Sequence, residues 1–249
     1  MSDIRQGAVI PVYNHGSTAE PIVDFLVEHH IPVIIVDDGS YLKTKAALAK
    51  IEKKYPDDVT LLTLPENQGK GAAVMIGIEM AAQQGLTHVL QIDADGQHDI
   101  NRVIPFFELS KANPEALICG YPVYDETVPK NRLTGRKITN TMIAIETLGS
   151  GIRDGMCGFR VYPVESTLKI KKKLAFPRMG FDIDVLVKLY WSGVPVIDSP
   201  VTVTYPEGGT SNFRMVHDNI EISLVHTRLF FGMLFRLPKL LALRKRNGR

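Results

Sequence analysis

The first 120 residues alternate short, continuously apolar segments with longer helical stretches. The apolar segments predict strands at 8–13, 32–38, 59–64, 87–93 and 116–120. The stretches between them predict helices at 19–30, 42–55, 71–85 and 100–112. Strands without polar alternation, separated by helices, are typical of a parallel sheet that is covered on both faces. The sequence therefore predicts an α/β fold, in which ligands bind beyond the carboxyl ends of the strands.

The second half of the chain is less regular. Residues 121–134, with two prolines and mixed charge, predict a loop. The rest predicts a helix at 136–148, a turn into a strand at 154–163, a helix at 181–193, and strand-like pieces with a Gly-rich loop at 194–213. No internal repeat or linker interrupts the pattern. We therefore expect one α/β domain at 1–215, followed by an amphipathic, basic helical extension at 216–249.

The C-terminal extension is apolar but carries scattered basic residues and ends in a basic cluster. Arg228, Arg236 and Lys239 interrupt it, so it does not predict a clean membrane span. One interpretation is a helix lying at a membrane surface, with its basic residues near lipid head groups. The other is a helix packed on the domain with a frayed tail. The sequence leaves both open, and the first predicts a peripheral membrane contact.

Composition and charge limit the class of protein. The 249 residues carry a formal net charge of +2, which gives no support for a nucleic-acid partner, and we expect none. Two cysteines do not form a disulfide framework and fit a reducing compartment. The sequence shows no apolar leader and no long uncharged apolar run. These features predict a cytoplasmic protein, peripheral to the inner face of a membrane if the extension binds lipid.

Polar residues follow each of the first four predicted strands. They are Tyr13 and Asn14 after the first, Asp37 to Gly39 after the second, Asn67 to Lys70 after the third, and Asp93 and Asp95 after the fourth. Because the carboxyl ends of parallel strands meet at one edge of a sheet, we expect these four groups to lie together.

The segment "DADGQH" places two carboxylates two positions apart at the end of a buried strand. Mg²⁺ and Mn²⁺ prefer oxygen ligands, and Mg²⁺ is often held by one or two carboxylates plus substrate phosphates. Asp93 and Asp95 are therefore candidate ligands of a metal ion that also binds a diphosphate. The alternative is a pair of solvated turn acids.

Two other segments suit a nucleotide. In "VDDGS", Asp38 is placed to accept hydrogen bonds from a base or a ribose, or to cap the next helix together with Ser40. In "NQGKGAA", Lys70 stands at a helix start, where the helix dipole favours anions. Gly71 and Val74 exclude both the P-loop and the G-x-G-x-x-G motif. A different nucleotide-binding fold is therefore required.

The ordered set "PVYN", "VDDGS", "NQGKGAA", "DADGQH" and "DGMCGFR" resembles family 2 glycosyltransferases with the GT-A fold, over about residues 7–215. The subgroup it resembles is the dolichyl- or polyprenyl-phosphate sugar synthases. The resemblance implies that a nucleotide-diphosphate sugar is held by Pro11, Tyr13, Asp38, Asp93, Ala94, Asp95 and Gln97, with Gln68 and Lys70 as further matches.

The resemblance also implies a reaction, in which an acceptor oxygen displaces the nucleoside diphosphate with inversion at the sugar. A Mg²⁺ or Mn²⁺ ion on Asp95 would offset charge on the leaving group, which gives Asp95 a catalytic role. An alcohol acceptor needs a general base, and Asp182 and Asp184 are the candidates, although either could serve the start of a helix instead. A phosphate acceptor is already largely ionised at neutral pH and needs no base. Arg136, Asp154 and Arg160 are the expected acceptor-side residues, with a turn residue as the alternative for Asp154.

These features predict a metal-dependent hexosyltransferase that acts on a lipid or lipid-linked acceptor at the cytoplasmic face of a membrane. One alternative is a soluble transferase to a sugar or protein hydroxyl. The other is a catalytically silent nucleotide-sugar-binding scaffold.

Overall fold

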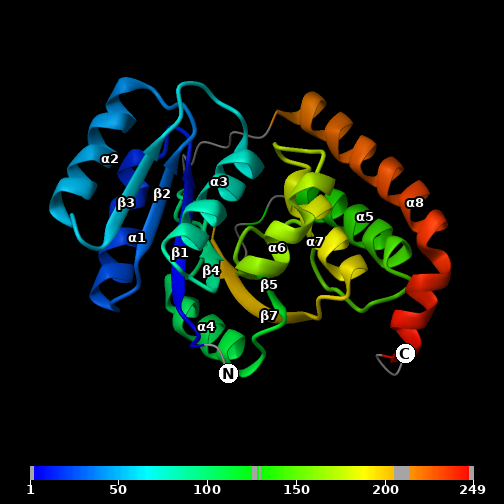
Figure 1. Ribbon diagram of the computed structural model, residues 1–249. Coiled ribbons are helices and arrows are strands. Elements are labelled where there is room, and N and C mark those ends of the chain that lie inside the picture. The colour runs from blue at the N-terminus through cyan, green and yellow to red at the C-terminus, as the bar shows by residue number, and fades with distance from the viewer. Residues whose placement is uncertain (1–2, 125–127, 129, 205–213, 247–249) are drawn as a thin grey trace.

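A seven-stranded sheet runs through the computed structural model, which describes residues 3–124, 128, 130–204 and 214–246 (Figure 1). The strand order is β3-β2-β1-β4-β6-β5-β7. The strands are β1 (Gln6–Val12), β2 (Val33–Asp37), β3 (Val59–Thr63), β4 (His88–Gln91), β5 (Leu117–Tyr124), β6 (Arg160–Pro163) and β7 (Val196–Val203).

Strand directions confirm the predicted, mostly parallel sheet. Strand β1 pairs in parallel with β2 and β4, β2 with β3, and β5 with β7. Strand β6 lies antiparallel between β4 and β5. Of the seven described strands, only β6 runs against the others, so the carboxyl ends of β1 to β4 share one edge.

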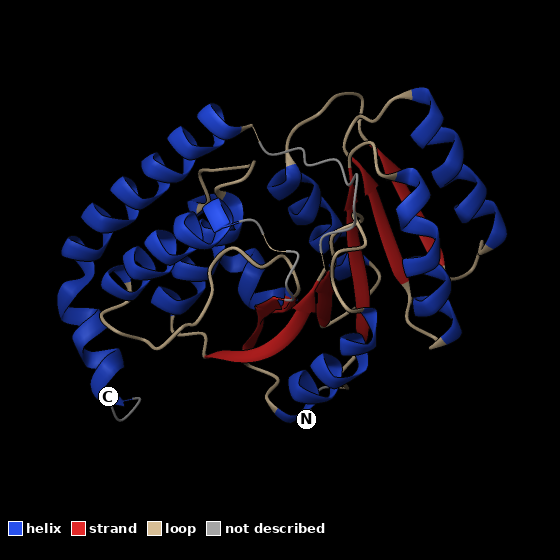
Figure 2. Ribbon diagram, turned by 180° about the vertical axis from the view of Figure 1, so that it is seen from behind, coloured by secondary structure: helices blue, strands red, loops and turns tan. Residues whose placement is uncertain are grey.

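Helices cover both faces of this sheet (Figure 2). They are α1 (Gly16–Glu28), α2 (Leu42–Lys54), α3 (Lys70–Gln83), α4 (Val103–Ala112), α5 (Lys130–Glu146), α6 (Val164–Ile170), α7 (Phe181–Ser192) and α8 (Met215–Arg246), with the 3-10 turns η1 (Ile100–Arg102) and η2 (Lys171–Lys173). Helices α1, α2 and α4 pack on one face, while α3, α6 and α7 pack on the other. The fold therefore has the predicted three-layer α/β arrangement.

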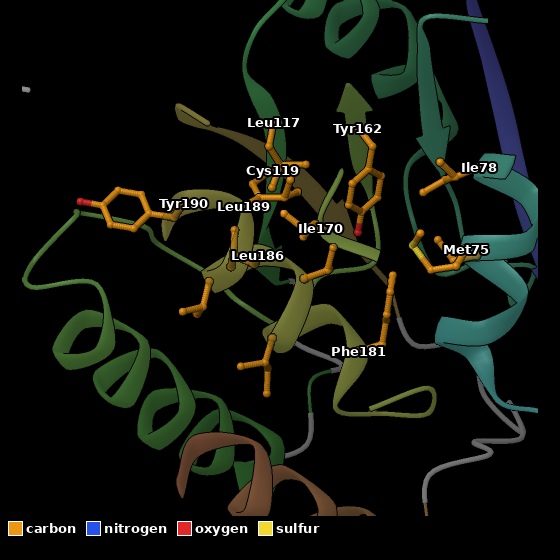
Figure 3. Packing of buried hydrophobic residues seen from close by; sticks show 14 of the residues in the cluster. Met75, Ile78, Leu117, Cys119, Tyr162, Ile170, Phe181, Leu186, Leu189 and Tyr190 are labelled. Atoms are coloured by element: carbon orange, nitrogen blue, oxygen red, sulfur yellow. The ribbon is translucent and has the colours of Figure 1, made fainter. Parts of the chain in front are cut away.

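Alternate residues of a strand enter opposite cores, because successive side chains of a strand point to opposite faces. On β1, Val9 enters the core shared with α3 and α7, whereas Ala8 and Ile10 enter the core shared with α1. Figure 3 shows the first of these cores, where Tyr162 of β6 and Phe181 of α7 lie beside Met75 and Ile78 of α3. Burial on both faces explains why the strands read as continuous apolar runs.

Three segments differ from the expectation. Residues 121–134 were expected to be a loop, but β5 continues to Tyr124 and α5 begins at Lys130; residues 125–127 and 129 lie outside the described part. Helix α6 was not predicted, because it follows β6 directly with no turn residue between them. The Gly-rich part of the predicted segment 194–213 falls in 205–213, outside the described residues, whereas its first part forms β7.

Helix α8 is 32 residues long and runs along the outer edge of the molecule (Figure 1). It contacts α5 and α7, and it buries Val225, Leu229, Met233 and Leu240. This helix therefore packs on the domain, and the division of the chain at residue 215 stays a prediction. No helix among the described residues is both long and apolar enough to cross a membrane.

Candidate active site

The sheet edge formed by the carboxyl ends of β1 to β4 brings the predicted polar groups together. Parallel pairing aligns Val12 of β1 with Asp37 of β2, and Asp37 with Thr63 of β3. Residues that follow these strands therefore leave the sheet side by side, as do those that follow β4. The edge carries Asp38, the loop 67–69, Lys70 and the acids Asp93 and Asp95.

Asp38 anchors the loop that leads into α3. Its carboxylate accepts hydrogen bonds from the backbone N–H groups of Gln68 (2.7 Å) and Gly69 (2.9 Å) and from the side-chain amide of Asn67 (2.9 Å). Burial raises the pKa of Asp38, although these bonds act in the opposite direction. A carboxylate accepts about four hydrogen bonds, so one position remains on Asp38, which is buried, and its contact with a base or ribose stays a prediction.

Arg178 is a residue of this edge that the sequence did not reveal. Its guanidinium donates to the side-chain oxygen of Asn67 (2.5 Å) and to the backbone carbonyl of Asn67 (3.2 Å). The segment before α7 thus lies over the loop 67–69. The contact joins residues 111 positions apart, and no motif surrounds Arg178, so only the structure could show it.

Lys70 lies between two acids. Its ammonium is 2.9 Å from the carboxylate of Asp93 and 3.0 Å from that of Asp182. The other oxygen of Asp182 accepts from the side-chain amide of Gln91 (3.3 Å), and Gln91 in turn accepts from the hydroxyl of Tyr162 (3.0 Å). Burial acts to raise the pKa of Asp93, but Lys70, His98 and Gln91 together hold this pKa below its ordinary value.

Gly158 allows this cluster to form. A Cβ atom at this position would lie 2.5 Å from a carboxylate oxygen of Asp93 and 2.6 Å from the ammonium of Lys70. Any larger residue would therefore displace one of the two. The segment "DGMCGFR" brings its backbone against the acids that follow β4.

The two acids of "DADGQH" fit a divalent cation only with help from a ligand. One carboxylate oxygen of Asp93 is buried and has no hydrogen-bond partner among the described residues. Asp95 is partly exposed, and one of its oxygens accepts from the backbone N–H of Gln97 (3.1 Å). The described residues contain no group of three or more His, Cys, Asp or Glu side chains that could hold a metal ion. Asp93 and Asp95 thus suit a cation that takes its other ligands from phosphate and water.

The remaining predicted donor residues surround these acids. Pro11 lies in β1 beside Val36 of β2, and Tyr13 follows directly at the end of β1. Ala94 is buried, and its carbonyl accepts a hydrogen bond from the hydroxyl of Thr18. All nine predicted donor residues therefore lie on or beside the same sheet edge, although their contacts with a donor stay a prediction.

The two candidate bases occupy different places. Asp182 belongs to the cluster around Lys70. Asp184, in contrast, is fully buried, forms an ion pair with Lys188 (2.6 Å) and accepts from the backbone N–H of Ala175 (2.9 Å). The structure therefore places Asp184 away from the strand-end acids, because two residues along a helix turn the side chain to a different face.

Of the predicted acceptor residues, two lie together. The Arg136 guanidinium donates to Asp154 (2.5 Å and 3.2 Å), and Asp154 also accepts from the backbone N–H groups of Met156 (2.9 Å) and Cys157 (2.7 Å). Asp154 thus fixes the turn into β6 and ties it to α5. Burial opposes the charged form of Arg136, but Asp154 raises its pKa overall.

Arg160 does not join them. It is fully buried and donates to the backbone carbonyls of Cys157 (2.8 Å), Asp182 (2.6 Å) and Gly155 (2.8 Å). In this position Arg160 has no route to an acceptor, and the structure gives it a different role from the one expected. It holds the segment 155–158 against the start of α7.

A pocket of about 560 Å³ opens beside Arg136. Strand β5, helix α5 and the segment before β6 form its walls. The lining residues are Tyr121, Pro122, Tyr124, Leu133, Arg136, Lys137, Asn140, Thr141, Ala144, Arg153 and Asp154. Sequence reasoning found two of these residues, Arg136 and Asp154, because no motif marks the others and they come together only in the fold.

Comparisons with known proteins agree with this geometry. The sequence model of glycosyl transferase family 2 matches residues 8–170. Dolichyl-phosphate beta-glucosyltransferase of Dictyostelium discoideum is 28% identical over 247 residues, which cover 89% of this chain and 75% of the relative. Polyprenol monophosphomannose synthase of Mycolicibacterium smegmatis is 30% identical over 225 residues, which cover 87% of this chain and 83% of the relative.

A solved structure shows the same fold. Glucosyl-3-phosphoglycerate synthase of Mycobacterium tuberculosis, in complex with Mn²⁺, uridine-diphosphate-glucose and phosphoglyceric acid, matches with a TM-score of 0.63 at 17% identity. The match covers 94% of this chain and 79% of that chain. The architecture is thus that of a GT-A glycosyltransferase. The chain belongs to glycosyl transferase family 2, and the two relatives confirm the resemblance to polyprenyl-phosphate sugar synthases.

Proposed function

We propose that this chain transfers a hexose from a nucleoside-diphosphate sugar to a polyprenyl phosphate, with inversion at the sugar. One observation carries the proposal: the parallel strands bring Asp38, Lys70, Asp93 and Asp95 to a single edge of the sheet. At one end of this edge, Asp38 offers hydrogen-bond acceptors for a nucleoside. At the other end lie the ammonium of Lys70 and the carboxylates of Asp93 and Asp95. Such a set matches the two ends of a nucleoside diphosphate.

In this proposal, Asp38 and the loop 67–69 bind the nucleoside, while the acids after β4 face the diphosphate. Asp93 and Asp95 would hold a Mg²⁺ or Mn²⁺ ion, which when bound would offset the negative charge of the leaving diphosphate. Lys70 contributes a further positive charge at the N-terminus of α3, where the helix dipole also favours anions.

A phosphate acceptor fits the state of Asp182. A phosphate monoester has a second pKa of about 6 and is largely ionised at neutral pH, so it attacks without a general base. Asp182 is already engaged by Lys70 and Gln91. A hydroxyl acceptor would require a general base, and Asp182 would have to serve as one while it also holds Lys70 and Gln91. The two relatives are named for dolichyl phosphate and polyprenol, and these names also support a phosphate acceptor.

Helix α8 supplies the proposed membrane contact. Its outer surface exposes Ile220, Leu224, Phe231, Leu234, Phe235 and Leu241. Arg228 and Lys239 are also exposed on this helix, and Arg236 lies near the ring of Trp191. An exposed apolar stripe with basic neighbours is typical of a helix that lies in a lipid head-group layer. The proposal therefore places the enzyme at a membrane surface through α8.

The first experiment measures thermal stabilisation by UDP-, GDP- and dTDP-sugars, each with and without Mn²⁺. A ligand that binds only the folded state raises the melting temperature by mass action. We expect one nucleotide to give a Mn²⁺-dependent shift that Asp95→Asn abolishes. Asp99→Asn is the matched control, because Asp99 is a nearby acid that caps η1 and should leave the shift unchanged.

The second experiment offers a prenyl phosphate and the corresponding prenol to the donor-bound enzyme. Transfer to the phosphate alone supports the proposal. Transfer to the prenol or to a free sugar would instead support a hydroxyl acceptor with Asp182 as base. A chain that binds no donor under any condition would contradict a transferase function.

A further inference from the structure

The charge of the pocket beside Arg136 points to an anionic ligand. Arg136, Lys137 and Arg153 line it, and Asp154 is its one acidic lining residue. Asp154 is buried and pairs with Arg136, so the charge of Arg136 is offset within the protein. In the part of the chain that the structure describes, Lys137 and Arg153 form no ion pair. The pocket therefore presents two cations without a direct ion pair, of which Arg153 also feels the charge of Asp198.

Arg153 is held in a defined position at this pocket. Its guanidinium carbon lies 3.6 Å from the centroid of the Tyr121 ring, which is the stacked arrangement typical of a cation–π contact. Its backbone N–H donates to a carboxylate oxygen of Asp198 (3.2 Å). Strand β5 fixes Tyr121, which pairs with Pro200 of β7, so the ring is a firm platform for the side chain.

Stacking leaves the donors of Arg153 available. The Tyr121 ring covers one face of the guanidinium, whereas the N–H groups point outward within its plane. Two of these donors can bind two phosphate oxygens at once, a geometry that the single ammonium of Lys137 cannot provide. Arg153 is exposed, so no rearrangement of the protein is needed for a ligand to reach it.

The pocket also adjoins the strand-end acids. Asp154 follows Arg153 directly and holds the backbone of Cys157 (2.7 Å), and Gly158 comes next, against Asp93 and Lys70. Five residues thus connect the pocket wall to the proposed donor site. The wall of the pocket and the proposed donor site are therefore parts of one short segment of the chain.

We propose that Arg153, stacked on Tyr121, binds the phosphate of the acceptor and sets the preference of the enzyme for a phosphate-bearing acceptor over a neutral alcohol. This inference rests on the proposed function and names a specificity-determining residue for it. Arg136 is the positioning residue that shapes the pocket through Asp154, whereas Arg153 carries the charge that the ligand meets.

The test compares citronellyl phosphate with citronellol as acceptors for the full-length chain, with Mn²⁺ and whichever of UDP-glucose or GDP-mannose supports transfer. We expect Arg153→Gln to raise the KM for citronellyl phosphate by about 10- to 100-fold, the range for a lost charged hydrogen bond. Arg153→Lys, which keeps the charge without the fork, should give a smaller rise. Tyr121→Leu removes the platform and should also raise this KM, whereas Tyr121→Phe keeps the ring face and should not.

Two readouts separate failure of this inference from failure of the proposed function. The dissociation constant of the donor, measured by its thermal shift, reports the donor site alone and should be the same in Arg153→Gln and wild type. Arg5→Gln, at the opposite edge of the sheet before β1, controls for the loss of one positive charge. A KM for citronellyl phosphate within about twofold of wild type in Arg153→Gln would overturn the role of Arg153 but leave the proposed function standing. Donor binding by the wild type without transfer to citronellyl phosphate would overturn both.

Discussion

The ammonium of Lys70 lies 3.0 Å from the carboxylate of Asp182, so that the first residue of α3 is joined to the first turn of α7. The side-chain amide of Gln91 donates to the other oxygen of the same carboxylate (3.3 Å). Each oxygen of Asp182 thus accepts a hydrogen bond from another side chain. This carboxylate joins α3 to α7 and holds Lys70 in place.

Asp182→Asn should therefore lower kcat by less than about tenfold with a prenyl phosphate acceptor, because this acceptor is already ionised. Single-turnover kinetics with saturating donor would measure the effect. Loss of a general base would instead lower the rate by about 10²- to 10⁴-fold, and a fall of that size with unchanged donor affinity would restore Asp182 as the base.

Asp184→Asn makes a contrasting prediction, since Asp184 pairs with Lys188 inside the protein. Breaking a buried ion pair from one side leaves the other charge unpaired, at a cost of about 3 kcal/mol or more. We expect a clear loss in the free energy of unfolding, measured with urea, and a normal kcat for the folded fraction. A large loss of kcat in a protein of normal stability would contradict this assignment.

Gly158→Ala should disrupt the donor site. The added methyl group would lie within 2.6 Å of both Asp93 and Lys70, so one of them must move. We expect the Mn²⁺-dependent thermal shift with the donor to fall sharply. Gly135→Ala is the matched control, because a Cβ atom there has no atom of the described residues within 4 Å and should stabilise α5 by about 0.5–1 kcal/mol. An unchanged donor shift in Gly158→Ala would show that the cluster around Lys70 is not part of the donor site.

The sequence predicted the parallel half of this molecule better than the rest, for physical reasons. Strands β1, β2 and β4 are largely buried and the edge strand β3 is partly buried, so their apolar runs and the polar residues that follow them were visible in the chain. Strand β6 was predicted to exist, but nothing in four residues shows that it runs antiparallel. Helix α6 follows it directly, and Pro163 is both the last residue of β6 and the N-cap of α6, so no separate turn divides the two elements.

The sequence also did not predict the side-chain contacts between residues that are distant in the chain. Arg160 appears in the motif "DGMCGFR" as a charged residue, and charged residues are rarely buried. The structure buries it because three backbone carbonyls receive its donors. Arg178 and Arg153 acquire their positions from Asn67 and Tyr121, which are distant in the chain.

The buried pair of Glu146 on α5 and His226 on α8 predicts a pH effect on stability. Their side chains meet at 2.8 Å, and burial raises the pKa of Glu146 above its ordinary value of 4.5. A carboxyl whose pKa is higher in the folded state binds its proton more tightly there. The free energy of unfolding should therefore fall as pH rises from 4.5 through the raised pKa. Glu146→Gln should lack this contribution.

Urea unfolding at a series of pH values from about 4.5 to about 7 would check this sign, through the difference between wild type and Glu146→Gln. Glu165→Gln is the control, because Glu165 is exposed on α6 and Lys169 lowers its pKa. A difference between wild type and Glu146→Gln that stays constant with pH would show that Glu146 does not titrate in this range.

The outer surface of α8 gives the last prediction, on membrane binding. Phe235 is 87% exposed on the protein surface. Burial of a phenylalanine side chain away from water stabilises by about 1.5–3 kcal/mol, which lipid could supply here. Phe235→Glu should therefore lower partition onto vesicles that contain phosphatidylglycerol by about tenfold or more, without changing the melting temperature. Leu42→Glu is the matched control, because Leu42 is 84% exposed on α2, at the opposite side of the molecule from α8 (Figure 1). Equal partition of the two variants in a vesicle sedimentation assay would show that α8 does not insert, and the acceptor would then have to reach the pocket from solution.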